Sequence, residues 1–176
     1  MVIFAAHCIL LPGESPTEVR FGEEAEQPAR VVQTVDCAVN PDFSLDDGPG
    51  DFAYCTLAEP VEDVPIVPPL MGCETDFLEV GSEVVLAGFG FADSMPDYGF
   101  KRHVTTTVQE FFGDNEIVLG ANGMSSCYGD SGGPAFLQME DGSWRVFGIT
   151  SRGTSQQCGE PAIYGLMHAG AIPWIE

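Results

Sequence analysis

Basic residues are scarce in this chain of 176 residues, which has 6 Lys plus Arg against 27 Asp plus Glu. The formal net charge of −21 would repel nucleic acid and an anionic membrane surface, so we expect neither as a partner. The acidic residues are dispersed and favour solubility. Their densest cluster, residues 23–26, has the carboxylate oxygens that calcium prefers, but overall we predict no metal site and no cofactor.

Long apolar segments and helical periodicity are also missing. There is no apolar segment of the length that a transmembrane helix needs. Met1–Leu11 is apolar, but it lacks a basic start and contains His7 and Cys8, so it does not resemble a signal peptide. Short apolar runs alternate with turn residues, and the chain contains 21 Gly and 13 Pro. This pattern predicts an all-β fold.

Cysteine pairs of the C-x-x-C type are absent, which argues against a zinc ribbon and against thioredoxin-like redox chemistry. Structural disulfides in an oxidising compartment are the better interpretation, so we expect a secreted or extracellular protein. The six cysteines are Cys8, Cys37, Cys55, Cys73, Cys127 and Cys158.

The expected strands fall into two groups, separated by a connector with four prolines at 60–69 that excludes a helix or a central strand. We therefore predict an N-terminal unit over 1–59, a connector over 60–75 and a C-terminal unit over 76–176. The expected strands are 2–6, 18–21, 30–35, 51–57, 83–86, 101–109, 117–119, 135–138, 144–150 and 162–166.

The stretch Ser125–Pro134 (S-S-C-Y-G-D-S-G-G-P) concentrates glycines around Ser131. A serine hydroxyl is a weak nucleophile that needs a base, and the carbonyl that it attacks becomes an oxyanion that needs donors. Glycines on both sides of Ser131 allow the chain to bend and aim two amides at one point. We predict Ser131 as a nucleophile, with the N–H groups of Gly129 and Ser131 as the oxyanion hole.

His7 is the best of three candidate bases. His103 lies within an expected strand and is interpreted as a surface residue, and His168 is expected in a loop near the C-terminus. His7 lies in A-A-H-C, where small neighbours allow another segment to approach closely.

The base needs a carboxylate that orients its imidazole and stabilises the charged ring. Asp51 begins an apolar strand, where a carboxylate can be half-buried and fixed. Asp46 and Asp47, in the turn before that strand, fit less well.

Three segments together resemble the signatures of trypsin-like (chymotrypsin-fold) serine proteases: residues 5–8 (A-A-H-C), 51–57 (D-F-A-Y-C-T-L) and 127–134 (C-Y-G-D-S-G-G-P). They occur in that family's order of His, Asp and Ser. The resemblance implies two six-stranded antiparallel Greek-key barrels and a serine endopeptidase that works through an acyl-enzyme. It assigns His7 as general base, Asp51 as its orienting partner and Ser131 as nucleophile.

The resemblance also implies a substrate pocket. Ser125 would form its base, Gly153 its mouth and Ala162 part of its wall. Ser151 and Gly153 would pair with an extended substrate backbone. Because Ser125 is uncharged, we expect cleavage after Leu, Met, Phe or Tyr rather than after Arg or Lys.

Several features depart from the family pattern. Arg152 replaces an aromatic residue in the strand along the cleft. The family places several strands before its histidine, so we expect an N-terminally truncated chain with an incomplete first barrel. Asp130 would pair with a new N-terminal amine in the family, and we expect that partner to be lacking. Whether the 176-residue chain turns over substrate by itself is therefore a separate question, and the sequence argues against it.

The remaining expectations concern cysteines and partners. The resemblance implies a Cys127–Cys158 disulfide and pairs Cys8 and Cys73 with upstream residues, whereas the pairing of Cys37 with Cys55 stays open. We expect a monomer whose partners are polypeptide substrates and protein protease inhibitors. The alternative function is a catalytically inactive protease homologue or fragment that acts as a binding module.

Overall fold

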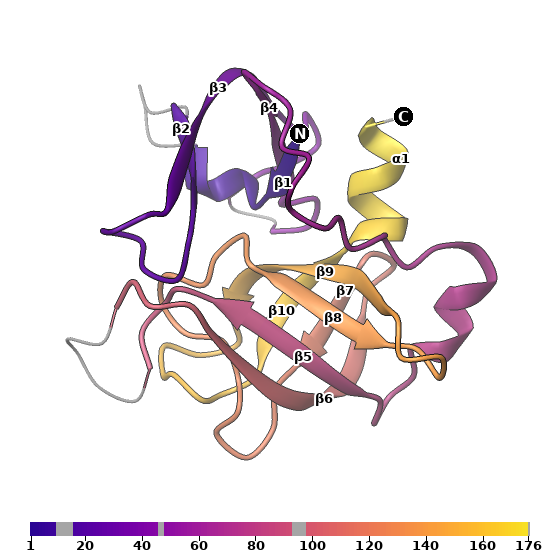
Figure 1. Ribbon diagram of the computed structural model, residues 1–176. Coiled ribbons are helices and arrows are strands. Elements are labelled where there is room, and N and C mark those ends of the chain that lie inside the picture. Colours follow the sequence, from indigo (N-terminus) through magenta and orange to yellow (C-terminus); the bar gives the residue numbers. More distant parts are fainter. Residues whose placement is uncertain (10–15, 46–47, 93–97, 176) are drawn as a thin grey trace.

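A computed structural model describes residues 1–9, 16–45, 48–92 and 98–175. Two β bodies stack on each other, a four-stranded sheet above a closed barrel in the view of Figure 1. Asp46 and Asp47, the alternative carboxylates, lie outside the described residues, as do the last two residues of Met1–Leu11. Within the described part of the chain, no helix is long and apolar enough to cross a membrane.

The N-terminal sheet is antiparallel, with the strand order β1-β4-β3-β2. Cys37 of β3 lies opposite Cys55 of β4, and the two form a disulfide that fixes the register of the central pair. The expectation of an incomplete first barrel is confirmed, since over the described residues this sheet curls but does not close. Its strands are β1 (Val2–Phe4), β2 (Glu18–Phe21), β3 (Arg30–Val39) and β4 (Ala53–Leu57).

The C-terminal body is a closed barrel with the order β10-β7-β6-β5-β8-β9, which confirms the predicted six-stranded antiparallel barrel. Its interior is filled by large apolar side chains, among which Tyr164, Phe147 and Ile117 are fully buried. Its strands are β5 (Glu83–Gly88), β6 (Arg102–Phe112), β7 (Glu116–Leu119), β8 (Pro134–Gln138), β9 (Trp144–Gly153) and β10 (Ala162–Leu166).

The connector between the bodies runs beside β9. The Leu70 N–H donates to the Val146 carbonyl, the Val146 N–H donates to the Pro68 carbonyl, and Leu70 is fully buried. A 3₁₀-helix, η2 (Gly72–Phe77), follows. The boundaries at 59 and 75 stay predictions, because the connector packs on the barrel without an abrupt end.

The chain ends in a π-helix, η3 (Met167–Ala171), and a short α-helix, α1 (Ile172–Ile175), which lies beside the N-terminal sheet in Figure 1. The prediction that His168 lies in a loop was wrong, because the segment M-H-A-G-A forms the π-helix. Its small residues allow this backbone to pack closely against the side chain of Phe52.

Phe52 joins the two bodies. It comes from the N-terminal unit, is fully buried, and packs with Ala5 against Ile149 of β9 and Met167 of η3. A Cβ atom at Gly170 would come within 2.2 Å of the Phe52 ring, so only glycine leaves room for the ring there. Because Asp51 precedes Phe52, this packing also places the candidate carboxylate.

Candidate active site

His7 and Asp51 form a two-point contact. His7 lies in the 3₁₀-helix η1 (Ala6–Ile9), directly after β1. Its Nδ1 lies 2.7 Å from Asp51 Oδ2, and its backbone N–H donates to Asp51 Oδ1 over 2.9 Å. The His7 side chain is 28% exposed and that of Asp51 only 3%. The ring is thus held by a buried acid but stays accessible to a ligand.

The same contacts shift the proton affinity of both groups. The hydrogen bond to Asp51, followed by one to Cys8, raises the pKa of His7 above its ordinary value of 6.5. Burial alone would raise the pKa of Asp51, but hydrogen bonds from His7 and Ser151 outweigh burial and hold that pKa below its usual range. Asp51 is therefore an anion that stabilises a positively charged His7.

Ser151 supplies the third contact to the acid. Its Oγ donates to Asp51 Oδ2 over 2.6 Å, and this residue is buried in β9 of the barrel. The carboxylate comes from the N-terminal unit, so the hydrogen bond crosses between the two bodies.

Ser131 lies at a sharp bend before β8, and its side chain is exposed. Gly129 adopts a φ of +91°, a left-handed conformation that favours glycine. Gly133 allows a second close approach, since a Cβ there would lie 2.7 Å from the Ala87 carbonyl oxygen. Within the described residues, neither the Gly129 nor the Ser131 N–H donates to another group, so both amides are available to an oxyanion.

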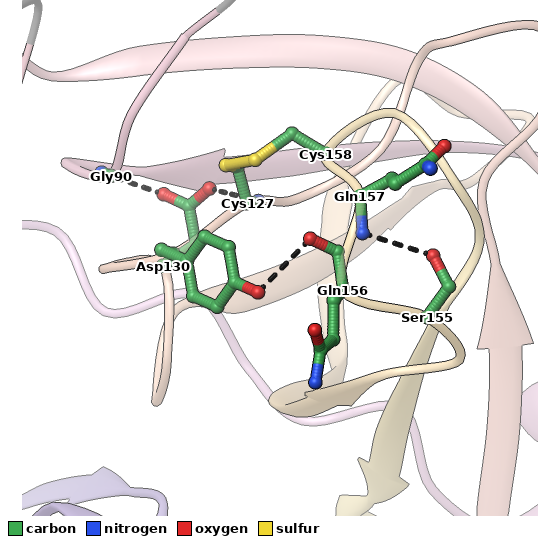
Figure 2. The surroundings of a disulfide bond; sticks show 8 residues. Gly90, Cys127, Asp130, Ser155, Gln156, Gln157 and Cys158 are labelled. Atoms are coloured by element: carbon green, nitrogen blue, oxygen red, sulfur yellow. Dashed lines mark hydrogen bonds between the residues drawn. A yellow bond between two sulfur atoms is a disulfide. The ribbon is translucent and has the colours of Figure 1, made fainter. Parts of the chain in front are cut away.

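The carboxylate of Asp130 is satisfied by backbone amides. The Gly90 N–H donates to Oδ1 and the Cys127 N–H donates to Oδ2, each over 2.8 Å. Figure 2 shows both bonds beside the Cys127–Cys158 disulfide. These two amides partner the carboxylate, and the expectation that a new N-terminal amine is lacking stays a prediction. The role of Asp130 as an activation-type carboxylate stays a prediction.

One cavity of about 400 Å³ gathers most of the predicted site residues. It is lined on one side by His7 and Asp51 from the N-terminal unit and on the other by residues of the barrel. The predicted site residues from the barrel that line it are Gly129, Ser131, Ser151, Gly153 and Ala162, together with Cys127 and Cys158. We call this cavity the cleft.

Ser125 lies outside the cleft. It lines an adjoining cavity of about 370 Å³ with Ser126, Asp130 and Tyr164, and of the described residues only Ser126 lines both cavities. The Oγ atom of Ser125 is buried without a hydrogen-bond partner among the described residues. Gly120 explains the orientation, since a Cβ at Gly120 would lie 2.7 Å from that Oγ. Among the described residues Ser125 thus borders the adjoining cavity and not the cleft, and its role as the base of the substrate pocket stays a prediction.

The sequence did not predict two contacts of residues that line the cleft, an ion pair of Arg152 and a hydrogen bond between Tyr128 and Gln156. Arg152 pairs with Glu116 through two hydrogen bonds of 2.6 and 2.9 Å. The Tyr128 hydroxyl donates to the Gln156 carbonyl over 3.0 Å, which ties the segment before Ser131 to the opposite wall. The one feature of the sequence that could have indicated the ion pair is Arg152 itself, which stands where the family has an aromatic residue.

The two remaining cysteines, Cys8 and Cys73, are free and exposed. Among the described residues, no group of three or more His, Cys, Asp or Glu side chains is arranged to hold a metal ion.

Fold and cleft together define a class of protein: an all-β chain in which a histidine, an acid and a serine from two β bodies line one cleft. The family model described as Trypsin matches residues 1–175. The chain therefore belongs to the trypsin family.

Two long matches support the assignment. The chain is 28% identical to the serine proteinase stubble of Drosophila melanogaster over 97% of this chain and 25% of the relative. It is 26% identical to the vitamin K-dependent protein C of Mus musculus over 94% of this chain and 40% of the relative. A shorter match is 54% identical to chymotrypsin-C of Rattus norvegicus, over 24% of this chain and 16% of the relative. The chain thus spans less than half the length of these curated relatives.

Proposed function

We propose that this chain acts as a serine endopeptidase that hydrolyses peptide bonds through an acyl-enzyme. The observation that carries the proposal is the 2.7 Å contact between His7 Nδ1 and buried Asp51, in a cleft that also contains Ser131 and two unused amides. Asp51 fixes the tautomer in which His7 Nε2 accepts a proton. The −21 charge and two disulfides support an extracellular setting, with polypeptide substrates and protein inhibitors as partners.

The reaction has two halves. Ser131 Oγ attacks the carbonyl carbon while His7 takes its proton, and the N–H groups of Gly129 and Ser131 stabilise the negative oxygen. His7 then gives the proton to the leaving amine, which departs from the acyl-enzyme. A water molecule attacks the ester, again with His7 as base, and Ser131 regains its proton.

The first test is covalent labelling of Ser131 by a fluorophosphonate probe. We expect the purified chain, or a longer product of the same gene if one is expressed, to be labelled, and Ser131→Ala to abolish the labelling. Ser143→Ala, which changes a half-buried serine before β9 and outside the cleft, is the matched control. No labelling of any form would contradict the enzyme and favour the alternative, an inactive homologue that binds peptides.

We further propose a preference for apolar residues before the scissile bond. Gly153 and Ala162 add no charge to the wall, Ser126 adds only a hydroxyl, and Glu160 is the acidic residue that lines the cleft beside them. Chromogenic peptides that end in Leu, Phe or Arg test this. Faster cleavage after Arg would contradict it.

A further inference from the structure

Arg152 occupies an unusual place in the cleft. It lies in β9 between Ser151, which holds Asp51, and Gly153, and its side chain is 33% exposed. Among the described residues that line the cleft, it is the only Lys or Arg. Gly48 packs on its guanidinium group, since a Cβ at Gly48 would lie 2.8 Å from Arg152 Cζ. The cation is therefore held in the cleft that His7 and Asp51 also line.

Glu116 anchors this cation from behind. The glutamate lies in β7, its side chain is only 3% exposed, and its two oxygens accept hydrogen bonds from Nη1 and Nη2 of Arg152. A buried carboxylate needs such a partner, and a bidentate contact holds the guanidinium plane in one orientation.

The geometry leaves one edge of the guanidinium group unused. Of its five N–H donors, two face Glu116, and the second hydrogen of Nη1 faces Ser151 Oγ at 3.4 Å. The Nε–H and the second hydrogen of Nη2 remain, and within the described residues neither has a partner. These two donors lie on the same edge and point the same way, which matches the two oxygens of a carboxylate.

Arg145 shows the opposite arrangement in the same strand. Its Nε and Nη2 both donate to Glu74, and its Nη1 donates to Ser143 Oγ and the Trp144 carbonyl. The edge that Arg152 leaves open is thus closed by Glu74 at Arg145.

We propose that Arg152 recognises an acidic side chain of the substrate, on the side that precedes the scissile bond. This inference rests on the proposed function, because it assumes that the peptide lies along β9 beside Ser151 and Gly153. The acidic side chain would lie two to four residues before the bond that is cut. The protein's net charge of −21 disfavours acidic peptides at long range, so the preference depends on the local contact with Arg152.

The test measures peptide binding to the Ser131→Ala variant by calorimetry, so that it does not depend on turnover. Peptides with Asp or Glu at each of these three upstream positions are compared with the isosteric Asn and Gln peptides. We expect the acidic peptide to bind about tenfold more tightly at one position, as a bidentate charged contact allows. Equal affinities at all positions, or no binding of any peptide, would overturn the proposal.

Three further variants, each made in the Ser131→Ala background, assign the effect to Arg152. Arg152→Lys keeps a charge opposite Glu116 but loses the open edge, so the acidic preference should fall to about twofold or less. Arg152→Leu combined with Glu116→Leu removes both buried charges together and should abolish the preference. Arg145→Lys is the matched control and should leave it unchanged. Retention of the preference in the Arg152 variants would refute the assignment.

The two proposals fail separately. If Ser131 of the unmodified chain resists the fluorophosphonate while the acidic preference and its loss in Arg152→Lys are observed, the chain is a peptide-binding homologue and the assignment of Arg152 stands. If Ser131 is labelled but acidic and amide peptides bind equally, the enzyme stands and Arg152 has no such role.

Discussion

The closed barrel and the four-stranded sheet differ in how they are held together. Every strand of the barrel pairs on both sides, and its core cluster contains many large, fully buried side chains. The sheet leaves β1 and β2 as edges, and it relies on the Cys37–Cys55 disulfide and on the docking of Phe52 against the barrel. The barrel closes on itself around its own core, whereas the sheet is held in place by a disulfide and by its contacts with the barrel.

This difference matters because the candidate site is divided between the two bodies. The sheet side supplies His7 and Asp51, and the barrel supplies Ser131 and Ser151. In the proposed mechanism, the reaction at Ser131 depends on the position of His7, which comes from the unclosed sheet side.

The largest expected effect comes from cutting the link between the base and its acid. Asp51→Asn should lower kcat/KM on a chromogenic peptide by a factor on the order of 10⁴, because the amide favours the wrong tautomer of His7. Asp63→Asn, which removes only a surface partner of Arg30, is the control and should have no effect. A loss of less than about tenfold in Asp51→Asn would mean that Asp51 does not orient the base.

The contact that docks the sheet on the barrel comes next. Phe52→Ala should lower the free energy of unfolding in urea by about 3–5 kcal/mol, because it empties a fully buried site. Phe111→Ala, at a side chain of β6 that is 45% exposed, should cost far less. Similar losses in the two variants would contradict the assigned role of Phe52.

The two disulfides should separate stability from binding. They link residues 18 and 31 positions apart, so removing either pair as Cys→Ser should cost about 3 to 4 kcal/mol of unfolding free energy in the chain-entropy account. Only the Cys127–Cys158 pair lines the cleft, so only its loss should raise KM. An equal rise in KM from loss of the Cys37–Cys55 pair would show that the sheet's disulfide also shapes the cleft.

The smallest expected effect is a difference between two histidines, whose pKa values should be shifted in opposite directions. Asp51 and Cys8 raise the pKa of His7 above 6.5, whereas burial lowers the pKa of His168. An NMR titration of the imidazole Cε1–H signals should place their midpoints on opposite sides of 6.5. A His7 midpoint that stays unchanged in Asp51→Asn would contradict the role given to the acid.

The sign of the pH dependence follows. The raised pKa of His7 means that its ion pair with Asp51 stabilises the fold fully below pH 6.5 and is lost as pH rises through the raised value. Turnover runs the other way, because a general base must be neutral, so kcat/KM should rise over the same interval.

Much of the fold follows from local patterns. β2 and β10 have the bounds that the sequence predicts, and the closed barrel agrees with the expected architecture. β3 extends to Val39 instead of ending at 35, because pairing with β4 carries polar residues such as Asp36 into the strand. The π-helix at 167–171 has no local signal, since it depends on packing against Phe52.

The site was predictable where short motifs carry it and not where distant residues meet. The motifs around His7, Asp51 and Ser131 identified residues that line one cleft. The pairing of Glu116 with Arg152 spans 36 positions and arises because β10 lies between β7 and β9 in the barrel. The burial of Ser125 depends on the space that Gly120 leaves, and the sequence does not indicate that these two residues lie side by side.

The central claim is that a base from the sheet activates a nucleophile on the barrel. The rate of fluorophosphonate labelling of Ser131 in His7→Ala, relative to the unmodified chain, tests it most directly. We predict a rate lower by about 10²–10⁴-fold, with His103→Ala, an exposed histidine of β6, unchanged. Equal labelling rates in His7→Ala and the unmodified chain would contradict the account.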